Sequence, residues 1–449
     1  MPDEAARPAG SPDPGFPSFA DALRVWLRIG LLSFGGPAAQ IALMHREVVE
    51  QRRWISERRF LQALNFCMLL PGPEAQQLAT YLGWLMHGVK GGLAAGLLFI
   101  LPGAALMLAL SGVYLVFGTV PLVAALFLGL KCAVLALVLE ALLRVARKAL
   151  TGALSLGLAA AAFVALFVFA VPFPLVVLAA LVAGFVLPGA FAAGGGGAAK
   201  DGDASLVDAA FRADPGLAAR RASGARRAGL VALALWLWPV ALLSGAGLWG
   251  DLAWFFSQMA VVTFGGAYAV LAYVAQEAVE NYRWLSAADM LAGLGLAETT
   301  PGPLILVLQF VGTLAGAREA GVGGAVLGAL LVLWVTFAPC FAWIFLGAPF
   351  VERAQGIARL QGALAAVTAA VVGVIANLAL WFGLRVLFAE QAETGFGALS
   401  LPVPSSLDIP AIALAGFAAA LLFGAKLGLV RTLALTAAAG LVLRVAGLA

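Results

Sequence analysis

Two kinds of turn in this sequence have the chemistry to hold an anion, and each occurs twice. One is a glycine pair, Gly35-Gly36 and again Gly265-Gly266, and the other is Pro71-Gly72-Pro73 and again Pro301-Gly302-Pro303. A helix that starts after such a turn directs unpaired backbone N–H groups and the positive end of its dipole at the turn. Four such starts converging inside a membrane would hold an anion without a full positive charge. The glycines that would let the solute approach the backbone are Gly36, Gly72, Gly266 and Gly302.

Several polar side chains lie within a turn or two of these breaks and could donate hydrogen bonds to an anion. They are Asn65, Gln76, Gln77, Thr299 and Thr300. The alternative for each is a structural role, in which the side chain bonds a hairpin to a neighbouring helix.

Lys131 lies near the middle of the apolar segment Pro121–Leu143. A cation at that depth costs a few kcal/mol, so it is expected to face the protein interior with a partner. We interpret it as the counter-charge of the substrate. The alternatives are a structural pair with Glu74 or Glu298, or a lysine that reaches the membrane surface.

Glu74 and Glu298 flank the two Pro-Gly-Pro turns, one on each side. A carboxylate there would repel an anion unless it were protonated, and burial favours the protonated form. This arrangement suggests proton coupling. The membrane potential is the alternative driving force, because expelling two negative charges gains about 4–5 kcal/mol per 100 mV.

Four positions between the turns recur in both copies at helical spacing: Glu47, Glu50, Arg53 and Trp54, then Glu277, Glu280, Arg283 and Trp284. Glu50 and Arg53 are predicted to form an ion pair, and Trp54 to anchor at the membrane interface. We expect this element to fix the orientation of the hairpins, with a gate or a substrate-recruiting patch as the alternative. Arg24 and Arg28 are predicted to reach the cytoplasmic surface.

These residues belong to a long internal repeat in a very apolar chain. Residues 34–73 align without a gap to residues 264–303, with 16 of 40 positions identical. The 449 residues are 63% hydrophobic and 11% charged, and the long apolar runs lack the alternation of a membrane barrel. Duplicated membrane units are most often transporters. The three cysteines and two histidines show no metal-ligand spacing, so no metal or cofactor is predicted, and a net charge of +4 does not indicate nucleic acid.

The predicted organisation has five parts: a disordered tail (1–18), a first repeat (19–190), a cytoplasmic linker (191–227), a linking transmembrane helix (228–250) and a second repeat (251–449). The predicted fold is an all-α polytopic membrane protein of two inverted repeats. Each repeat has two broken, re-entrant helical hairpins plus four spanning helices. The four predicted spans of the first repeat are Gly91–Phe117, Pro121–Leu143, Leu150–Ala170 and Leu175–Ala190.

Charge bias predicts that the repeats are inverted. Residues 44–60 carry five arginines and three glutamates, whereas residues 276–290 carry one arginine and three carboxylates. The positive-inside rule therefore places the first stretch in the cytoplasm and the second outside. The extra span between the repeats provides the reversal.

The F-G-G, E-x-x-E-x-x-R-W and P-G-P motifs, in this order and twice, make the chain similar to the chromate ion transporter family. Long members of that family also have two homologous halves, and the resemblance covers nearly the whole length past residue 18. It implies export of chromate, a tetrahedral dianion, from the cytoplasm across a bacterial inner membrane, giving chromate resistance. The second copy differs from the first after the Pro-Gly-Pro turn, where Leu304 is the equivalent of Glu74. The two halves are therefore not expected to contribute polar side chains to the site equally.

Two other functions remain as alternatives. One is a transporter of sulfate or another organic or inorganic anion with the same architecture. The other, remote, is an intramembrane lipid-phosphate enzyme, which would need a nucleophile or base that neither Pro-Gly-Pro turn offers. We therefore predict a transporter and not an enzyme. A homodimer is left open.

Overall fold

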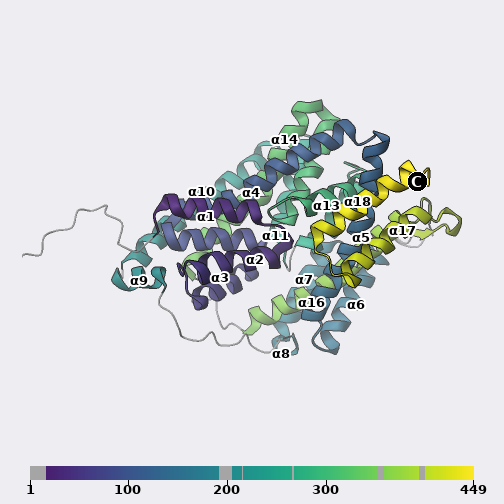
Figure 1. The fold of residues 1–449 in the computed structure, drawn as a ribbon. Coiled ribbons are helices and arrows are strands. Elements are labelled where there is room, and N and C mark those ends of the chain that lie inside the picture. The colour runs from purple at the N-terminus through teal and green to yellow at the C-terminus, as the bar shows by residue number, and fades with distance from the viewer. Residues whose placement is uncertain are drawn as a thin grey trace, which may run out of the picture.

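The computed structural model describes residues 17–191, 205–214, 216–264, 267–350, 358–393 and 400–448. Gly265 and Gly266 lie outside the described residues, as do most of the predicted tail and residues 192–204 of the predicted linker. Within the described ranges the chain is helical apart from turns, loops and one two-stranded hairpin (Figure 1).

The first half contains α1 (Phe19–Leu32), α2 (Gly36–His45), the π-helical turn η1 (Arg46–Gln51), α3 (Glu57–Leu69), α4 (Glu74–Phe117), α5 (Pro121–Ala149), α6 (Ala153–Phe167), α7 (Phe173–Val186) and α8 (Pro188–Phe191). The linker region contains α9 (Leu206–Ala213) and α10 (Leu217–Leu242).

The second half contains α11 (Leu248–Val262), α12 (Ala267–Gln276), η2 (Glu277–Asn281), α13 (Ala287–Thr299), η3 (Leu304–Leu306), α14 (Val307–Gly347), η4 (Ala348–Phe350) and α16 (Ala358–Leu387). It ends with the hairpin β1 (Gln391–Glu393) and β2 (Ser400–Pro402), then η5 (Pro404–Ser406), α17 (Ile409–Ala419), η6 (Ala420–Gly424) and α18 (Leu429–Val445).

Five helices in the described part of the chain are long and apolar enough to cross a membrane. They are Glu74–Phe117, Pro121–Ala149, Leu217–Leu242, Leu304–Gly347 and Arg359–Leu387. The protein is therefore a multi-pass, all-α membrane protein.

Several helix boundaries differ from the prediction, among them the end of α5, which extends to Ala149. The predicted spans Leu150–Ala170 and Leu175–Ala190 are the shorter helices α6 and α7, because Ala170 has a left-handed φ of 51° and Pro172 precedes α7. The linking helix α10 begins inside the predicted linker. It ends before residue 250 because Gly245 and Gly247 adopt positive φ angles.

Helices end at the predicted breaks for which both sides are described. In the first half, α1 ends at Leu32 and α3 ends at Leu69, each a few residues before the next helix begins. The helices around the first break, α1 and α2, have 14 and 10 residues. Both are shorter than the roughly 30 Å hydrocarbon core requires.

The long helices α4 and α14 each change direction at a non-helical pair: His87-Gly88 in α4 and Ala320-Gly321 in α14. Both glycines have φ near 60°, which most other residues adopt only with strain.

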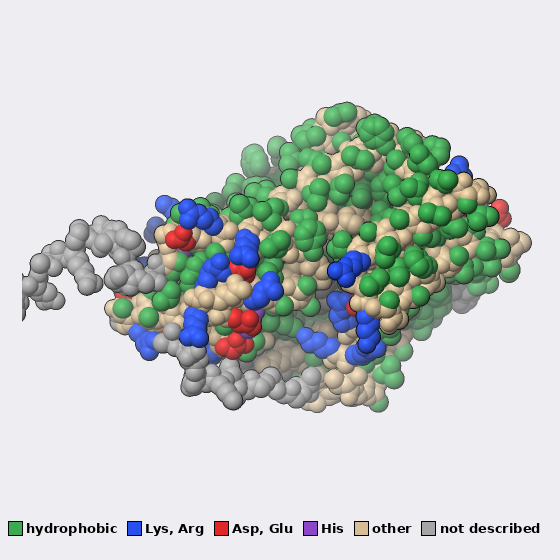
Figure 2. All heavy atoms as spheres, in the orientation of Figure 1, with side chains coloured by type: hydrophobic (Ala, Val, Ile, Leu, Met, Phe, Trp, Pro, Cys, Tyr) green, Lys and Arg blue, Asp and Glu red, His purple; other side chains and the backbone are tan. Residues whose placement is uncertain are grey.

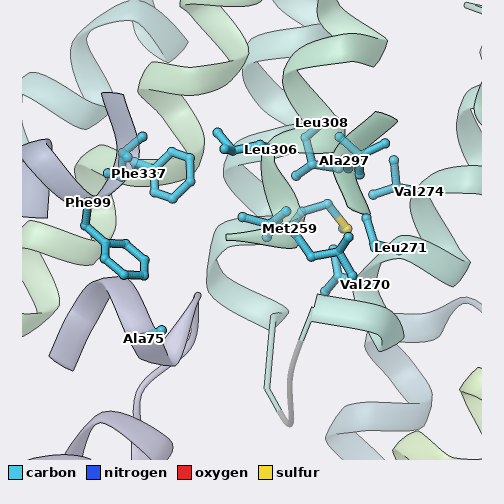
Figure 3. Packing of buried hydrophobic residues seen from close by; sticks show 14 of the residues in the cluster. Ala75, Phe99, Met259, Val270, Leu271, Val274, Ala297, Leu306, Leu308 and Phe337 are labelled. Carbon is cyan, nitrogen blue, oxygen red and sulfur yellow. The ribbon is translucent and has the colours of Figure 1, made fainter. Parts of the chain in front are cut away.

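The two halves are joined crosswise at their breaks. The N–H of Gly72 donates to the carbonyl oxygen of Thr263 at 2.8 Å, and the N–H of Gly302 donates to that of Ser33 at 2.8 Å. The surrounding core is apolar, and Figure 3 shows Phe99 of α4 and Phe337 of α14 among the side chains packed there. Each Pro-Gly-Pro turn is thus bonded to the other half of the molecule.

The linker lies against the arginine-rich stretch 44–60. The N–H groups of Leu206 and Val207 donate to the carbonyl oxygens of Arg53 and Trp54, and Arg59 forms an ion pair with Asp208. Figure 2 shows Lys and Arg side chains gathered over the end of the molecule where α1, α2 and α3 lie in Figure 1.

The packing of α4 against the second turn predicts a local sensitivity. A Cβ added at Gly103 would collide with the carbonyl oxygen of Pro301, whereas one added at Gly112 of the same helix meets no atom within 4 Å. We expect Gly103→Ala to lower the free energy of unfolding by about 1–3 kcal/mol through overpacking. Unfolding of the purified protein in detergent measures this effect. Gly112→Ala is the control and should be neutral or slightly stabilising; equal effects of the two changes would contradict the proposed close contact.

Candidate functional site

The two Pro-Gly-Pro turns are enclosed by protein. Gly72 and Gly302 are buried, with φ angles of 120° and 94° that favour glycine. The flanking prolines shape each turn: Pro73 and Pro303 are buried, as is Pro301, and Pro71 is half-buried. The backbone at both turns therefore stays inside the protein, as irregular backbone at membrane depth requires.

The starts of the helices differ between the halves. In the first half, α2 begins at Gly36 after the N-cap Gly35, with φ angles of 77° and 89°, and α4 starts at Glu74 without a side-chain cap. A helix start without a side-chain cap leaves its first backbone N–H groups without intrahelical partners. In the second half the turn leads into η3, a single 3₁₀ turn, before α14 begins. The two copies therefore differ in the backbone that follows the Pro-Gly-Pro turn.

Gln40 ties the first break to the second turn. Its Nε2 donates to the carbonyl oxygen of Gly302 at 2.6 Å and to that of Ser33 at 3.2 Å. The sequence analysis did not identify this residue. The signal was present, because Gln40 is a polar residue in an apolar stretch and its counterpart in the second copy is Val270.

Three further glutamines are buried near the turns. Gln76 donates to Thr80 and Gln77 to the carbonyl oxygen of Pro71, while Gln309 donates to the carbonyl oxygen of Ala104. The Oε1 atoms of these three, and of Gln40, have no hydrogen-bond partner among the described residues. Buried polar atoms are normally paired, so these four amide oxygens are exceptions to that rule beside the turns.

Thr299 and Thr300 are placed differently from the expectation. Their hydroxyls donate to the carbonyl oxygens of Leu296 and Ala297, at the end of α13. The hydroxyl hydrogens are therefore used by the helix and do not point at a solute. Asn65 is exposed on α3.

Glu298 is 7% exposed and accepts a hydrogen bond from the Tyr268 hydroxyl at 2.6 Å. The guanidinium of Arg144, which is paired with Glu140 on α5, also acts on Glu298 electrostatically. The sequence analysis identified neither Tyr268 nor Arg144 as a candidate site residue. Glu74, at the other turn, is half-buried and faces the charge of Lys148.

Lys131 is half-buried on α5 and forms no hydrogen bond or ion pair with any residue of the described ranges. The carboxylate that acts on it electrostatically is Asp289, and neither Glu74 nor Glu298 is its partner. The two pairings considered from the sequence are therefore not formed in this structure.

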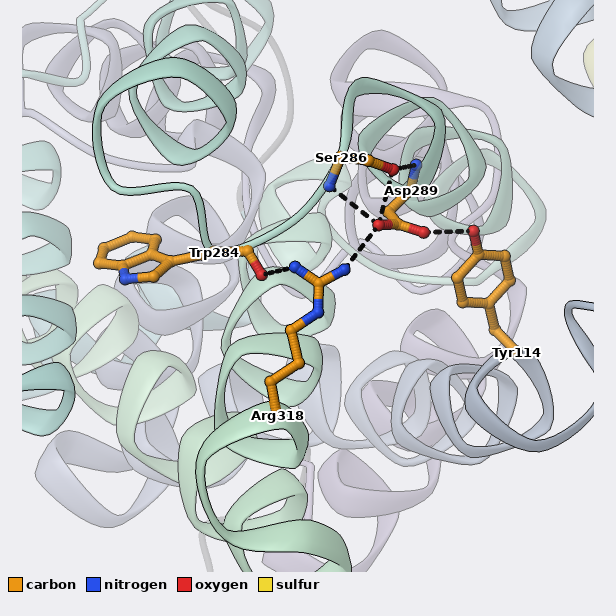
Figure 4. Close-up of polar contacts among 5 residues, drawn as sticks. All are labelled: Tyr114, Trp284, Ser286, Asp289 and Arg318. Atoms are coloured by element: carbon orange, nitrogen blue, oxygen red, sulfur yellow. Dashed lines mark hydrogen bonds and ion pairs between the residues drawn. The ribbon is translucent and has the colours of Figure 1, made fainter.

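Asp289 is the centre of a polar cluster that joins three helices (Figure 4). It accepts a hydrogen bond from the Tyr114 hydroxyl of α4 at 2.7 Å and pairs with Arg318 of α14 at 3.0 Å. Arg318 also donates to the carbonyl oxygen of Trp284. The cluster fixes the start of α13 against α4 and against α14 beside its kink.

The predicted ion pair between Glu50 and Arg53 is not formed. Glu50 pairs with His45 at 3.1 Å, and Arg53 has a φ of 53°. The helix has ended by that residue, so the i,i+3 geometry on which the prediction relied is lost. Glu47, only 1% exposed, is instead the paired carboxylate, with Arg52 at 2.5 Å and Arg28 at 3.6 Å.

Trp54 and Trp284 are both buried in the protein, with 8% and 6% exposure. Each backbone N–H closes the same turn, with acceptors Val48 and Ala278, and Arg283 repeats the left-handed φ of Arg53 at 54°. The indole rings therefore pack the end of each hairpin. In the second copy, Glu277 accepts from Asn281, and Glu280 pairs with Arg385 and accepts from Trp381.

The linker adds one titratable group outside the membrane-spanning segments. Burial alone would raise the pKa of Asp208, but hydrogen bonds from Arg59, Ser56 and Ser205 hold this pKa below its usual value. The ion pair that docks the linker is therefore formed at neutral pH. Among the described residues, no group of three or more histidines, cysteines or carboxylates could hold a metal ion.

Comparison with known proteins identifies what this chain resembles. A family model described as chromate transporter matches residues 20–185 and 250–443. A chromate transport protein of Pseudomonas aeruginosa is 32% identical over 388 residues, which cover 83% of this chain and 84% of that protein. A chromate transport protein of Cupriavidus metallidurans is 29% identical over 354 residues, which cover 78% of this chain and 79% of that protein. No solved structure shows a significant match.

Gln40 provides a test of the central arrangement. We expect Gln40→Leu to lower the free energy of unfolding by about 1–3 kcal/mol, because the buried carbonyl oxygen of Gly302 loses its donor. Gln62→Leu, at a half-buried position on α3, is the matched control. Thermal unfolding in detergent compares the two, and a Gln40→Leu protein as stable as the wild type would argue against this bridge.

Proposed function

Because this chain belongs to the chromate transporter family, we propose that it exports chromate from the cytoplasm across a bacterial inner membrane and so gives chromate resistance. The family points to a transporter rather than an enzyme. The observation that carries the proposal is the crosswise contact of broken helices inside an all-helical membrane protein, with buried amides beside them. Broken helices that meet at membrane depth are a common way to bind ions in transporters.

We propose that the two repeats are inverted in the membrane, and the contacts at the two ends of α4 support this. The part of α4 after Gly88 is about 40 Å long, at 1.5 Å per residue, which is enough to cross a bilayer. At one end the carbonyl oxygen of Met86 accepts from Arg221 of α10, and at the other Tyr114 bonds Asp289.

The arginine-rich stretch belongs to the Met86 end. Phe211 of α9 lies between two guanidinium groups, 5.0 Å from that of Arg59 and 5.2 Å from that of Arg221. Arg59 lies in the stretch 44–60, whereas Asp289 lies in the acidic stretch of the second repeat. The two stretches therefore lie at opposite ends of a membrane-length helix. The positive-inside rule then orients the Arg59 end toward the cytoplasm.

The chromate dianion is proposed to bind where the uncapped start of α4 meets Gln76 and Gln77. Its counter-charge is Lys131 or Arg144, the latter released from Glu140 and Glu298. A membrane potential that is negative inside favours export of a dianion by about 4–5 kcal/mol per 100 mV. Protonation of Glu74 or Glu298 would add coupling to the proton gradient.

The orientation is tested with two equivalent exposed positions, 230 residues apart: Arg58 and Ala288. In a variant whose native cysteines are replaced, we expect a membrane-impermeant maleimide to label Ala288→Cys in intact cells but to label Arg58→Cys only after permeabilisation. Labelling of both from the same side would contradict the inverted arrangement.

The counter-charge is tested by chromate uptake into inside-out vesicles. We expect Lys131→Met to lower the initial rate at limiting chromate about tenfold, the effect of losing ~1.4 kcal/mol of binding. If Arg144→Gln lowers the rate and Lys131→Met does not, Arg144 is the counter-charge instead of Lys131. Lys426→Met, which removes an exposed lysine, is the control and should transport normally. Competition by excess sulfate measures the selectivity between oxyanions.

Proton coupling is tested by imposing pH and voltage gradients separately in the same vesicles. We expect Glu74→Gln to remove the response to the pH gradient and to leave voltage-driven uptake in place, because the amide cannot bind and release a proton. If neither Glu74→Gln nor Lys131→Met alters flux in a normally inserted protein, the assignment of the binding site is wrong.

A further inference from the structure

A separate hollow lies at the cytoplasmic end assigned above, away from the turns. It has a volume of about 700 Å³ and is lined by residues 86–90 of α4, Phe19 of α1, and Arg220, Arg221 and Gly224 of α10. It surrounds the kink at His87-Gly88, where the short first part of α4 turns into its membrane-length part. None of the proposed substrate-binding residues lines it.

The hollow is strongly cationic. Lys90, Arg220 and Arg221 line it, and no carboxylate among the residues that the structure describes does so. Arg220 is held by Asp214, but Lys90 is exposed and has no ion pair or hydrogen bond with any residue that the structure describes. An anion in the hollow would therefore meet a lysine that no carboxylate neutralises.

Arg221 offers a donor that lacks an acceptor. Its Nη2 donates to the carbonyl oxygen of Met86 at 2.8 Å, and this bond fixes the guanidinium beside the kink. Its Nη1 is buried and has no acceptor within the described part of the chain. A buried N–H group without an acceptor is unfavourable, and an anionic oxygen would satisfy it.

The surroundings of the hollow match a lipid headgroup. It lies where two helices of membrane-spanning length, α4 and α10, reach the charged end of the molecule. Exposed apolar side chains continue from it along both helices, with Leu93 and Leu97 on α4 and Leu230 and Val231 on α10. A ligand with a phosphate at the hollow and acyl chains along these side chains would match both surfaces. Basic pockets at the cytoplasmic ends of transmembrane helices are suited to anionic lipids.

We propose that this hollow binds the phosphate of an anionic phospholipid, with Lys90 and Arg221 as its principal cationic contacts. The bound headgroup would hold α1, α4 and α10 together around the kink of α4. Inorganic phosphate shares the recognised chemistry, so the test must distinguish it from the lipid.

The experiment measures lipid binding by native mass spectrometry of the full-length protein in detergent, with phosphatidylglycerol or phosphatidylcholine as the added lipid. We expect the wild type to retain phosphatidylglycerol in preference to phosphatidylcholine. Lys90→Gln should weaken retention of phosphatidylglycerol about fivefold, the effect of one cation near an anionic lipid. Arg226→Gln is the matched control, since it removes an exposed cation of α10 that does not line the hollow. Arg221→Gln is expected to weaken retention as well.

Three results would overturn the proposal. The first is equal retention of phosphatidylglycerol by Lys90→Gln and the wild type, and the second is an equal loss in Arg226→Gln, which would indicate only general surface charge. The third is that millimolar inorganic phosphate displaces the lipid and that phosphate alone stabilises the protein as much as phosphatidylglycerol does. This result would assign the hollow to free phosphate. This binding measurement does not use transport, so its failure is separate from failure of the proposed chromate export.

Discussion

The structure depends on satisfying backbone groups where helices break inside an apolar environment. At each break the chain loses intrahelical hydrogen bonds that lipid cannot replace. Here each half of the chain supplies the missing partner to the other: Gly72 bonds Thr263, and Gly302 bonds Ser33. The two halves therefore cannot separate at this point without exposing unpaired backbone groups, and the breaks are held together at the centre of the fold.

The polar side chains beside the turns, unlike these backbone hydrogen bonds, are unequal between the halves. Gln40 completes the bonding of the second turn and is replaced by Val270 in the other copy, while Glu74 is replaced by Leu304. The backbone hydrogen bonds at the two turns are equivalent, but the polar side chains beside the turns are not. The repeat thus preserves the turns, while the side chains beside them differ between the halves.

Charged clusters lie at the two ends of the membrane-length part of α4. The linker helix α9 docks on the arginine-rich stretch through Asp208, and the cluster around Asp289 closes the opposite end of α4. Two charged side chains between these ends differ in their partners. Glu298 accepts a hydrogen bond from Tyr268, whereas Lys131 has no direct partner among the described residues. An unpaired cation in an apolar segment is costly, which is why Lys131 is proposed as the counter-charge of the substrate.

The sequence by itself determined the membrane class, the repeat, the positions of the breaks and the family resemblance, because hydropathy, glycine and proline act locally and the motifs are contiguous. It also located the start of α5 at Pro121. Only the tertiary structure decided that each turn bonds the other half, that Gln40 bridges them, and that Glu47 rather than Glu50 is the buried, arginine-paired carboxylate. Those contacts join residues far apart in the chain or follow a left-handed turn at Arg53, and neither the packing of two halves nor a local reversal of φ can be derived from residue spacing.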